Sequence, residues 1–283
     1  MTTNCEINQL SSALFTQWDD YVKAHQEGSF FHLSGWKTVI EKSFNHTCYF
    51  LYAELDGQIC GVLPLVEVKS KLFGHALVST PFCVYGGAIG DSTDIVQQLE
   101  HQACQLAEKL DVDYLELRYR NEQESSLLLK QAHSTFGCEI AEDDEKILAN
   151  IKKKQRAVVR HSLKNELSCS FSSTAKDKDF NDFYHLLSIS YRNLGTPIFT
   201  QNYFENLMNV FDDCADIAII RDKDKKSSSA VMNFYFNDQV LPYYGGGNES
   251  ARRLKSADFM YYQVMCHAQV KGKKWFDFGR HKV

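Results

Sequence analysis

The sequence predicts an α/β fold of two related lobes, each with a mixed sheet and helices on its faces. A long internal repeat indicates this. Tyr85–Ala88, a helix and Tyr114–Arg118 in one half correspond to Tyr243–Gly247, a helix and Trp275–Arg280 in the other. Such a repeat is typical of two like lobes rather than a solenoid of small units. Interfaces between lobes commonly hold a ligand, so we expect the binding site there.

The composition is that of a soluble globular protein, with 44% apolar and 24% charged residues. At 283 residues the chain is long enough for two domains of ordinary size. Its net charge of -5 gives no overall attraction to nucleic acid or to an anionic membrane. We therefore expect no DNA partner, and any anion site must be a local basic cluster.

In the first half, apolar side chains recur at helical spacing over 14–22 and 36–44, with Ser34 placed as an N-cap of the second helix. Strands are predicted over 48–54 and 59–69, joined by a hairpin turn at Asp56-Gly57. The sheet continues over 76–89, a helix follows over 95–110, and 113–119 alternates like a strand.

The second half repeats this order. Its predicted elements are helices over 180–194 and 203–211, strands over 215–221, 228–236 and 239–244, a helix over 256–271 and a strand over 274–279. We therefore expect an N-terminal lobe over 1–125, a connecting region with a basic helix over 126–175, and a C-terminal lobe over 176–283.

The nine cysteines are scattered singly, without the spacing of a zinc site or a redox motif. We expect reduced thiols that pack as small apolar side chains, and no metal. Residues 1–10 do not resemble a signal peptide, and the longest apolar stretch, 59–68, is too short to span a bilayer. The expected protein is cytoplasmic and monomeric, with at most peripheral membrane contact.

The clearest local charge signal is a row of four cations, Lys152, Arg156, Arg160 and Lys164. Their i, i+4 spacing puts them on one stripe of a helix, where like charges repel. A phosphate-bearing partner, such as a nucleotide sugar, a coenzyme, a lipid head group or tRNA, would offset that repulsion. The alternative is a solvated face paired with the acids of 142–145.

A glycine run follows a predicted strand, at Tyr243-Tyr244-Gly245-Gly246-Gly247. Gly245 and Gly246 would let the backbone approach a ligand, and the next helix start would offer N–H groups to an anion. Arg252 lies in the same segment. A plain flexible turn is the alternative.

The last predicted strand carries an acid between two bulky apolar residues, Phe276-Asp277-Phe278. Alternation puts Asp277 on the face opposite both rings, where a buried carboxylate needs a partner. Arg280, a helix N-terminus or a substrate amine could supply it, and a structural ion pair is an equal alternative. Arg192 precedes a helix-ending glycine and could bind an anion at that loop.

Some functions have no support. The sequence contains no serine elbow, P-loop, HExxH or GxGxxG motif, which argues against hydrolase, kinase and dehydrogenase functions.

Four segments together resemble the FemAB-related proteins linked to PEP-CTERM/exosortase gene sets, in order and spacing over most of the chain. They are Lys152–Lys164, Arg192–Pro197, Leu241–Gly247 and Phe276–Arg280. That family belongs to the wider FemAB and GNAT superfamily. The resemblance implies tandem GNAT-like lobes, each with a mixed, mostly antiparallel sheet, and acyl transfer to an amine. Fem ligases use aminoacyl-tRNA and a peptidoglycan precursor, GNAT relatives use acyl-CoA, and the exosortase-linked branch occurs with extracellular polysaccharide genes.

The resemblance implies acyl-CoA or aminoacyl-tRNA as donor, and a small molecule or glycan precursor of the cell envelope as acceptor. We expect Tyr243 and Tyr244 to position substrate and Asp277 to orient the amine, with Asp258 as a further candidate proton acceptor. Cations would hold the donor's phosphates: Arg192, Arg280 and the stripe of Lys152, Arg156, Arg160 and Lys164.

One departure from the family concerns the C-terminus. Related chains continue after the Phe276–Arg280 strand with a Gly-rich segment, a Phe-Lys pair and a final strand, whereas this sequence stops at Val283. We therefore expect a truncated C-terminal lobe without the family's late lysine. Two alternatives stay open: a non-catalytic module that binds a phosphate-bearing glycan precursor or a protein, and nucleic-acid binding through 152–164.

Overall fold

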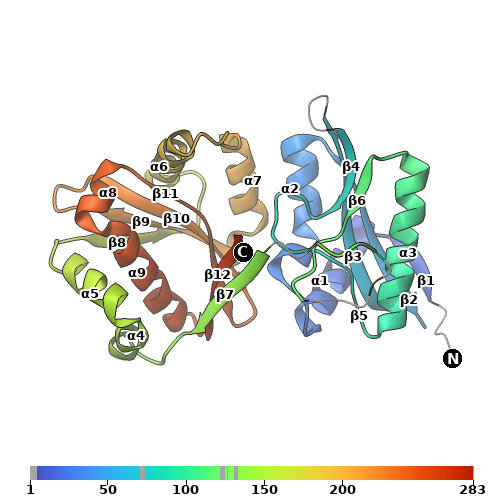
Figure 1. The fold of residues 1–283 in the computed structure, drawn as a ribbon, viewed down its shortest axis with the longest axis horizontal. Helices are drawn as coiled ribbons and strands as arrows, with labels where there is room; N and C mark the ends of the chain where they lie inside the picture. The colour runs from blue at the N-terminus through green and yellow to red at the C-terminus, as the bar shows by residue number, and fades with distance from the viewer. Residues whose placement is uncertain (1–4, 71–73, 122–124, 126, 131–132, 283) are drawn as a thin grey trace. The chain divides into compact units, whose positions relative to one another are not determined.

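The computed structural model describes residues 5–70, 74–121, 125, 127–130 and 133–282. Two compact units divide the chain, residues 1–132 and 133–283, and each is built on its own six-stranded sheet (Figure 1). Both sheets are mixed and carry helices, so the predicted α/β fold is confirmed. Within the described ranges, no helix is long and apolar enough to cross a membrane.

The first unit has the sheet order β1-β2-β3-β4-β6, and the short β5 pairs with β3. Its elements are β1 (Glu6–Gln9), α1 (Phe15–Ala24), α2 (Gly35–Phe44), β2 (Thr47–Leu55), β3 (Gln58–Ser70), β4 (Gly74–Ser79), β5 (Ile89–Gly90), α3 (Thr93–Leu110) and β6 (Tyr114–Glu116). The predicted Asp56-Gly57 hairpin is confirmed. Leu55 pairs with Gln58 across it, and both loop residues have positive φ, 51° and 76°, as in a type I′ turn.

The second unit has the sheet order β7-β12-β11-β10-β9-β8. Its elements are β7 (His133–Glu139), α4 (Asp144–Asn150), α5 (Lys153–Ser162), β8 (Ser168–Ser172), α6 (Lys178–Asn193), α7 (Gln201–Val210), β9 (Ala215–Arg221), β10 (Ser227–Phe236), β11 (Gln239–Gly247), α8 (Glu249–Leu254), α9 (Ser256–Val270) and β12 (Trp275–Lys282). Residues 133–175, which belong to the segment expected as a connecting region, thus supply two strands and two helices to this unit.

The two units share one order of elements. In each, a strand (β1 or β8) is followed by two helices, three antiparallel strands, a long helix (α3 or α9), and a strand that runs parallel to the third of those three. The first unit adds the short β5 before α3, and the second unit adds α8 before α9 and β7, α4 and α5 before β8. The parallel pair is β4 with β6 in the first unit and β11 with β12 in the second. This common path agrees with the duplication inferred from the sequence repeat.

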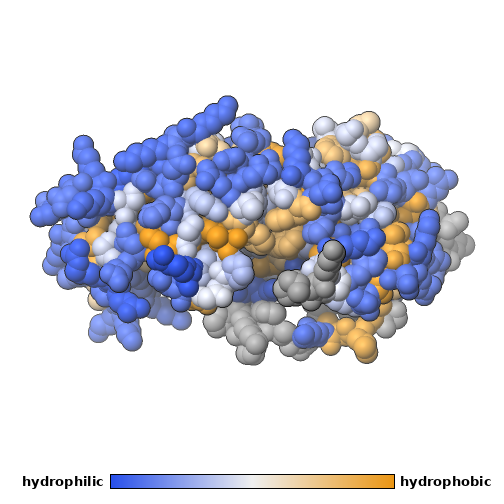
Figure 2. All heavy atoms as spheres, turned by 90° about the horizontal axis from the view of Figure 1, so that it is seen from above, coloured by the Kyte–Doolittle hydropathy of each residue, from blue (hydrophilic) through white to orange (hydrophobic). Residues whose placement is uncertain are grey.

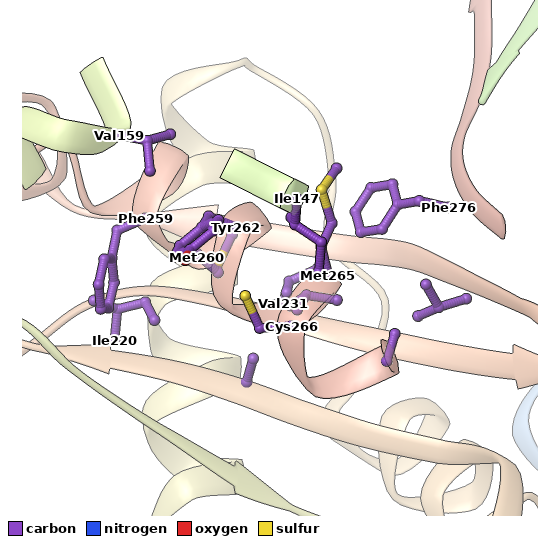
Figure 3. Close-up of a cluster of buried hydrophobic side chains, with 14 of the residues drawn as sticks. Ile147, Val159, Ile220, Val231, Phe259, Met260, Tyr262, Met265, Cys266 and Phe276 are labelled. Atoms are coloured by element: carbon purple, nitrogen blue, oxygen red, sulfur yellow. The ribbon is translucent and has the colours of Figure 1, made fainter. Parts of the chain in front are cut away.

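The core of the second unit lies on both faces of its sheet. Alternate residues of β9 and β10, including Ala218, Ile220 and Val231, pack against α9 with Val159 of α5 and Phe276 of β12 (Figure 3). Helices α6 and α7 cover the opposite face (Figure 1). Polar side chains dominate the outer parts of the face seen in Figure 2, as expected when apolar residues pack on the sheets.

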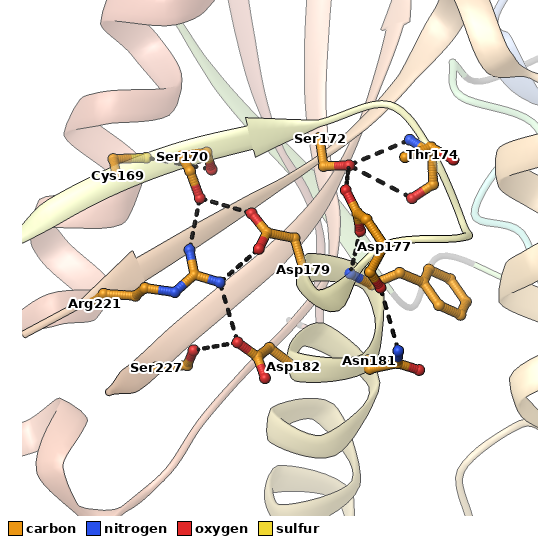
Figure 4. Close-up of polar contacts among 11 residues, drawn as sticks. Cys169, Ser170, Ser172, Thr174, Asp177, Asp179, Asn181, Asp182, Arg221 and Ser227 are labelled. Carbon is orange, nitrogen blue, oxygen red and sulfur yellow. Dashed lines mark hydrogen bonds and ion pairs between the residues drawn. The ribbon is translucent and has the colours of Figure 1, made fainter. Parts of the chain in front are cut away.

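A polar network anchors the start of α6 to the sheet (Figure 4). Arg221 of β9 forms ion pairs with Asp179 at 2.6 Å and Asp182 at 3.0 Å. The Asp177 carboxylate caps the helix by accepting the Phe180 N–H at 2.9 Å. The Arg221 guanidinium donates to two carboxylates of one helix, and we interpret the network as structural.

Two local predictions for the first unit are only partly confirmed. The stretch 76–89, expected as continuous sheet, consists of β4 and β5 separated by residues 80–88. Ser34 precedes α2, but its side chain makes no capping hydrogen bond, and its N–H donates to Asp19 at 2.7 Å. Its backbone is already helical there, with φ −59° and ψ −27°, whereas an N-cap needs extended geometry.

Candidate functional site

The parallel strands of the second unit separate after two residue pairs. Gln239 pairs with Trp275 and Val240 with Phe276. Beyond this point β11 continues along β10, and β12 continues along β7. In open α/β sheets, ligands bind outside the carboxyl ends of parallel strands where the strand order changes direction. The place where β11 and β12 separate, beyond Val240 and Phe276, is therefore the candidate site.

Tyr243 is the extra residue of a β-bulge at this point. Asn233 pairs with Pro242 and Met232 with Tyr244, so Tyr243 has no opposite residue on β10. Pro242 has no N–H to donate, which suits it to a break in the ladder. Bulges near active sites redirect a side chain, and this one redirects Tyr243. Its ring contacts Phe234 at 5.7 Å between centroids.

Tyr244 is buried against α7. Its hydroxyl lies 2.9 Å from the hydroxyl of Tyr203, and its ring meets Phe204 edge-on at 5.1 Å. Only 5% of Tyr244 is exposed. The sequence predicted Tyr203 only as part of a helix, because no local pattern shows that its hydroxyl contacts the hydroxyl of Tyr244 on β11. The pair holds Tyr244 in one orientation beside Tyr243.

Asp277 lies on the same face of the sheet as Tyr244. Phe276 and Phe278 both contact Tyr261 of α9, at 6.1 and 6.4 Å, so Asp277 faces the side covered by α6 and α7. It is 1% exposed. Its Oδ1 accepts the Gly279 N–H at 2.7 Å, so a backbone N–H is one of the partners that a buried carboxylate requires.

The glycine run is part of β11 and not a flexible turn. Gly245, Gly246 and Gly247 pair in register with β10, so the strand predicted to end at 244 extends to Gly247. A Cβ on Gly246 would lie 2.7 Å from backbone atoms of Leu186 and Leu187 in α6. At Gly245 the nearest atom would be 3.5 Å away and the residue is exposed. Of these two, Gly246 serves helix packing, and Gly245 leaves space for a ligand.

Two predicted cations lie at the carboxyl end of β11. Ser190, near the end of α6, donates through Oγ to the Gly247 carbonyl at 3.1 Å and accepts its N–H at 2.8 Å. Arg192, two residues further along α6, is exposed. Arg252 is exposed in α8, which begins two residues after Gly247. Arg280, further along β12, is also exposed.

The basic stripe lines an open surface groove. Arg156, Arg160 and Lys164 line it together with Lys153, Ala157 and His161. Lys152 precedes α5 as its N-cap residue and is not among the lining residues, and Lys164 lies beyond the helix end. The predicted stripe is therefore only partly helical, and sequence reasoning missed Lys153 and His161.

The alternative of a stripe neutralised by residues 142–145 is not what the structure shows. Glu142 and Asp143 instead pair with Lys146, at 2.5 and 3.6 Å. Among the residues that the structure describes, no ion pair joins an acid to Arg156, Arg160 or Lys164. The groove therefore concentrates positive charge that a bound anion would stabilise.

Asp258 lies apart from Asp277 and the tyrosines. It belongs to α9, on the opposite face of the sheet, and its carboxylate accepts a hydrogen bond from Gln155 of α5. Burial raises the pKa of Asp258. The structure places Tyr243, Tyr244 and Asp277 on β11 and β12 just beyond the point where these strands separate, and it leaves Asp258 beside the basic groove.

A second buried carboxylate, Asp216 of β9, was missed. It accepts hydrogen bonds from Asn233 at 2.9 Å, Tyr235 at 2.8 Å, Lys271 at 3.0 Å and His267 at 3.2 Å. Burial alone would raise its pKa, but these partners lower it overall. In the described part of the chain, no three His, Cys, Asp or Glu residues form a group that could hold a metal.

Comparisons with known proteins give a domain family for the second unit and a fold for the whole chain. Residues 145–282, which lie within the second unit, match the family model described as an acetyltransferase (GNAT) domain. The second unit carries an acyltransferase domain. The search of curated proteins finds no match.

Solved structures share the fold of the whole chain. FemX matches with a TM-score of 0.73 at 15% identity, over 98% of this chain and 89% of that one. A tandem GNAT protein from the clavulanic acid pathway matches at 0.54 and 9% identity, over 97% and 89%. Saccharomyces cerevisiae N-myristoyltransferase with bound myristoyl-CoA matches at 0.54 and 9%, over 98% and 73%. At these identities the likeness shows the fold alone, and the expected tandem GNAT-like architecture is confirmed.

Proposed function

We propose that the protein is an N-acyltransferase that moves an acyl or aminoacyl group from a phosphate-bearing donor to an amine. The observation that supports this most strongly is the GNAT family match, because it falls on the unit whose separating parallel strands carry Tyr243, Tyr244 and Asp277. Acyl-CoA and aminoacyl-tRNA are the two candidate donors. Both carry phosphates, which the basic groove of α5 could neutralise.

The chemistry assigns a role to each group. A neutral amine attacks the acyl carbonyl carbon, a new C–N bond forms, and the bond to the donor's sulfur or oxygen breaks as that atom takes up a proton. In this proposal Asp277, a buried carboxylate of β12 on the face of the sheet that holds Tyr244, orients the amine and accepts its proton. Tyr243 and Tyr244 position the acyl group, and Asp258 is a weaker candidate proton acceptor.

The acceptor is proposed to be an amine on a cell-envelope or polysaccharide precursor, handled in the cytoplasm. The resemblance to exosortase-linked FemAB-related proteins supports this class. The exposed cations Arg192 and Arg252 lie near the carboxyl end of β11, and Arg280 is exposed on β12, so that each could bind an anionic precursor.

Transfer kinetics with matched variants test the assignment. Wild type, Tyr243→Phe, Tyr244→Phe and Asp277→Asn would be compared with acetyl-CoA or aminoacyl-tRNA and a panel of amines. Asp277→Asn should lower kcat by about 100-fold or more, the usual contribution of a positioned proton acceptor. Asp238→Asn, at an exposed residue in the turn before β11, is the control and should be unchanged. Wild-type rates in all three site variants would remove the assignment.

A further inference from the structure

The counterpart of β11 in the first unit is divided into two strands, β4 and β5. β3 pairs with β4 from Leu65 to Ser70 and with β5 at Gly61 and Val62. In the second unit, β10 pairs with β11 along its whole length, interrupted only by the bulge at Tyr243. Residues 80–88 therefore interrupt the strand pair of the first unit at the position where the single bulge residue, Tyr243, interrupts that of the second.

The segment 80–88 crosses to the end of the parallel strand β6. The N–H groups of Gly86 and Gly87 both donate to the Arg118 carbonyl, at 3.0 and 2.9 Å. The Arg118 N–H donates to Ser79 Oγ at 2.8 Å, and its Nη1 donates to the Cys83 carbonyl at 2.7 Å. Because Val78 pairs with Glu116, Arg118 lies at the carboxyl end of the parallel pair. This end corresponds to the candidate site of the second unit.

The crossing segment is packed without room for a ligand. Thr80, Cys83, Tyr85 and Ala88 are all buried. A Cβ on Gly86 would meet Thr80 at 2.4 Å, and one on Gly87 would meet the Tyr119 ring at 2.5 Å. The cavity beside the segment is about 10 Å³. Small-molecule sites take about 300–1,000 Å³, so this space suits a single water.

The buried side chain of His32 holds the segment by a hydrogen bond to its backbone. His32 Nε2 lies 2.9 Å from the Gly87 carbonyl and Nδ1 lies 2.7 Å from Ser29 Oγ. A carbonyl only accepts, so Nε2 donates and Nδ1 accepts the serine hydroxyl. Burial lowers the pKa of His32 to about 4, so it stays neutral at physiological pH. Both ring nitrogens therefore hold the closed arrangement.

We infer that residues 80–88 are a built-in occupant of the first unit's strand-end site, so that the acyl donor binds in the second unit alone, once per chain. The inference rests on the proposed function, because it takes an acyl donor as the ligand. It also assigns Arg118 as the residue that keeps the first site closed, through its carbonyl, its N–H and its guanidinium.

Titration calorimetry of the full chain with acetyl-CoA, and separately with aminoacyl-tRNA, tests the stoichiometry. The expected result is one donor per chain. Gly245→Trp fills the space at the β11 end and should weaken binding at least tenfold. The matched variant in the first unit is Val84→Trp, in the half-buried part of 80–88, and should bind as wild type does. Two sites per chain, or loss of binding in Val84→Trp alone, would overturn the inference.

Hydrogen exchange of the wild-type chain gives a readout that needs no variant to fold. Saturating acetyl-CoA should protect amides of 241–247 and 277–280 and leave 79–88 unchanged. Protection of 79–88 instead would place the donor in the first unit and refute the inference while keeping the proposed function. If neither acetyl-CoA nor aminoacyl-tRNA bound to the chain, the inference and the proposed function would both be refuted.

Discussion

Gly246→Ala should destabilise the second unit although it adds a single methyl group. The Cβ would lie 2.7 Å from the Leu186 carbonyl oxygen and 2.7 Å from the Leu187 Cα, closer than real Cβ contacts come. Both are backbone atoms of α6, so the whole helix must shift. Overpacking of this kind costs about 1–3 kcal/mol. In a unit of this size each kcal/mol lowers the Tm by about 2–4 °C.

The neighbouring glycine is the matched control. A Cβ on Gly245 meets its nearest atom at 3.5 Å, an ordinary contact. Replacing a strand glycine with alanine removes an entropic cost of about 0.5–1 kcal/mol, so Gly245→Ala should be neutral or slightly stabilising. Urea unfolding followed by circular dichroism measures both. Equal free energies of unfolding for the two variants would refute the conclusion that α6 packing requires Gly246.

Three further outcomes are expected. Asp216→Asn should cost about 1–3 kcal/mol at pH 7, because an amide in place of the buried carboxylate cannot accept all the hydrogen bonds from Asn233, Tyr235, His267 and Lys271. The carboxylate's lowered pKa means that its stabilisation is present above the unfolded pKa of about 3.9 and is lost as pH falls through the folded pKa. Urea unfolding should show the gap to wild type narrowing at pH 3, and a constant gap would contradict this. Reversing the charge at Arg156 and Arg160 should weaken donor binding by at least about tenfold at 0.05 M salt. The loss should be much smaller at 1 M salt, because charges are then screened within about 3 Å. A loss of affinity that calorimetry finds independent of salt would argue against an anion-binding groove. Tyr203→Phe leaves the Tyr244 hydroxyl without this partner and should cost about 1–3 kcal/mol, and an unchanged Tm would show that the pair does not stabilise α7 on the sheet.

Local chemistry made much of the fold predictable. The Asp56-Gly57 turn depends on two residues that tolerate positive φ, and the helices show apolar side chains at helical spacing over their own length. The segment 80–88 was not predictable in this way. Tyr85-Gly86-Gly87 has the same local pattern as Tyr244-Gly245-Gly246, but only the second lies in the ladder. The difference depends on Arg118, which is distant in sequence.

The part of the site that depends on the alternation of side chains along one strand could be predicted from the sequence. The alternation of Phe276, Asp277 and Phe278 correctly predicted that Asp277 lies opposite both rings. The role of Gly246 was missed because it depends on where α6 docks. Asp216 was missed for a similar reason, since its partners come from two further elements, β10 and α9, and no window of sequence contains them all.

The bond formed in the product tests the central claim most directly. The chain would be incubated with acetyl-CoA or aminoacyl-tRNA and amine-bearing envelope precursors, and the acceptor would be weighed by mass spectrometry before and after alkaline hydroxylamine. An N-acyltransferase gives an acceptor heavier by one acyl group, in an amide that survives hydroxylamine. An unchanged acceptor mass with every donor, or a gain that hydroxylamine removes as an ester, would contradict the proposed chemistry.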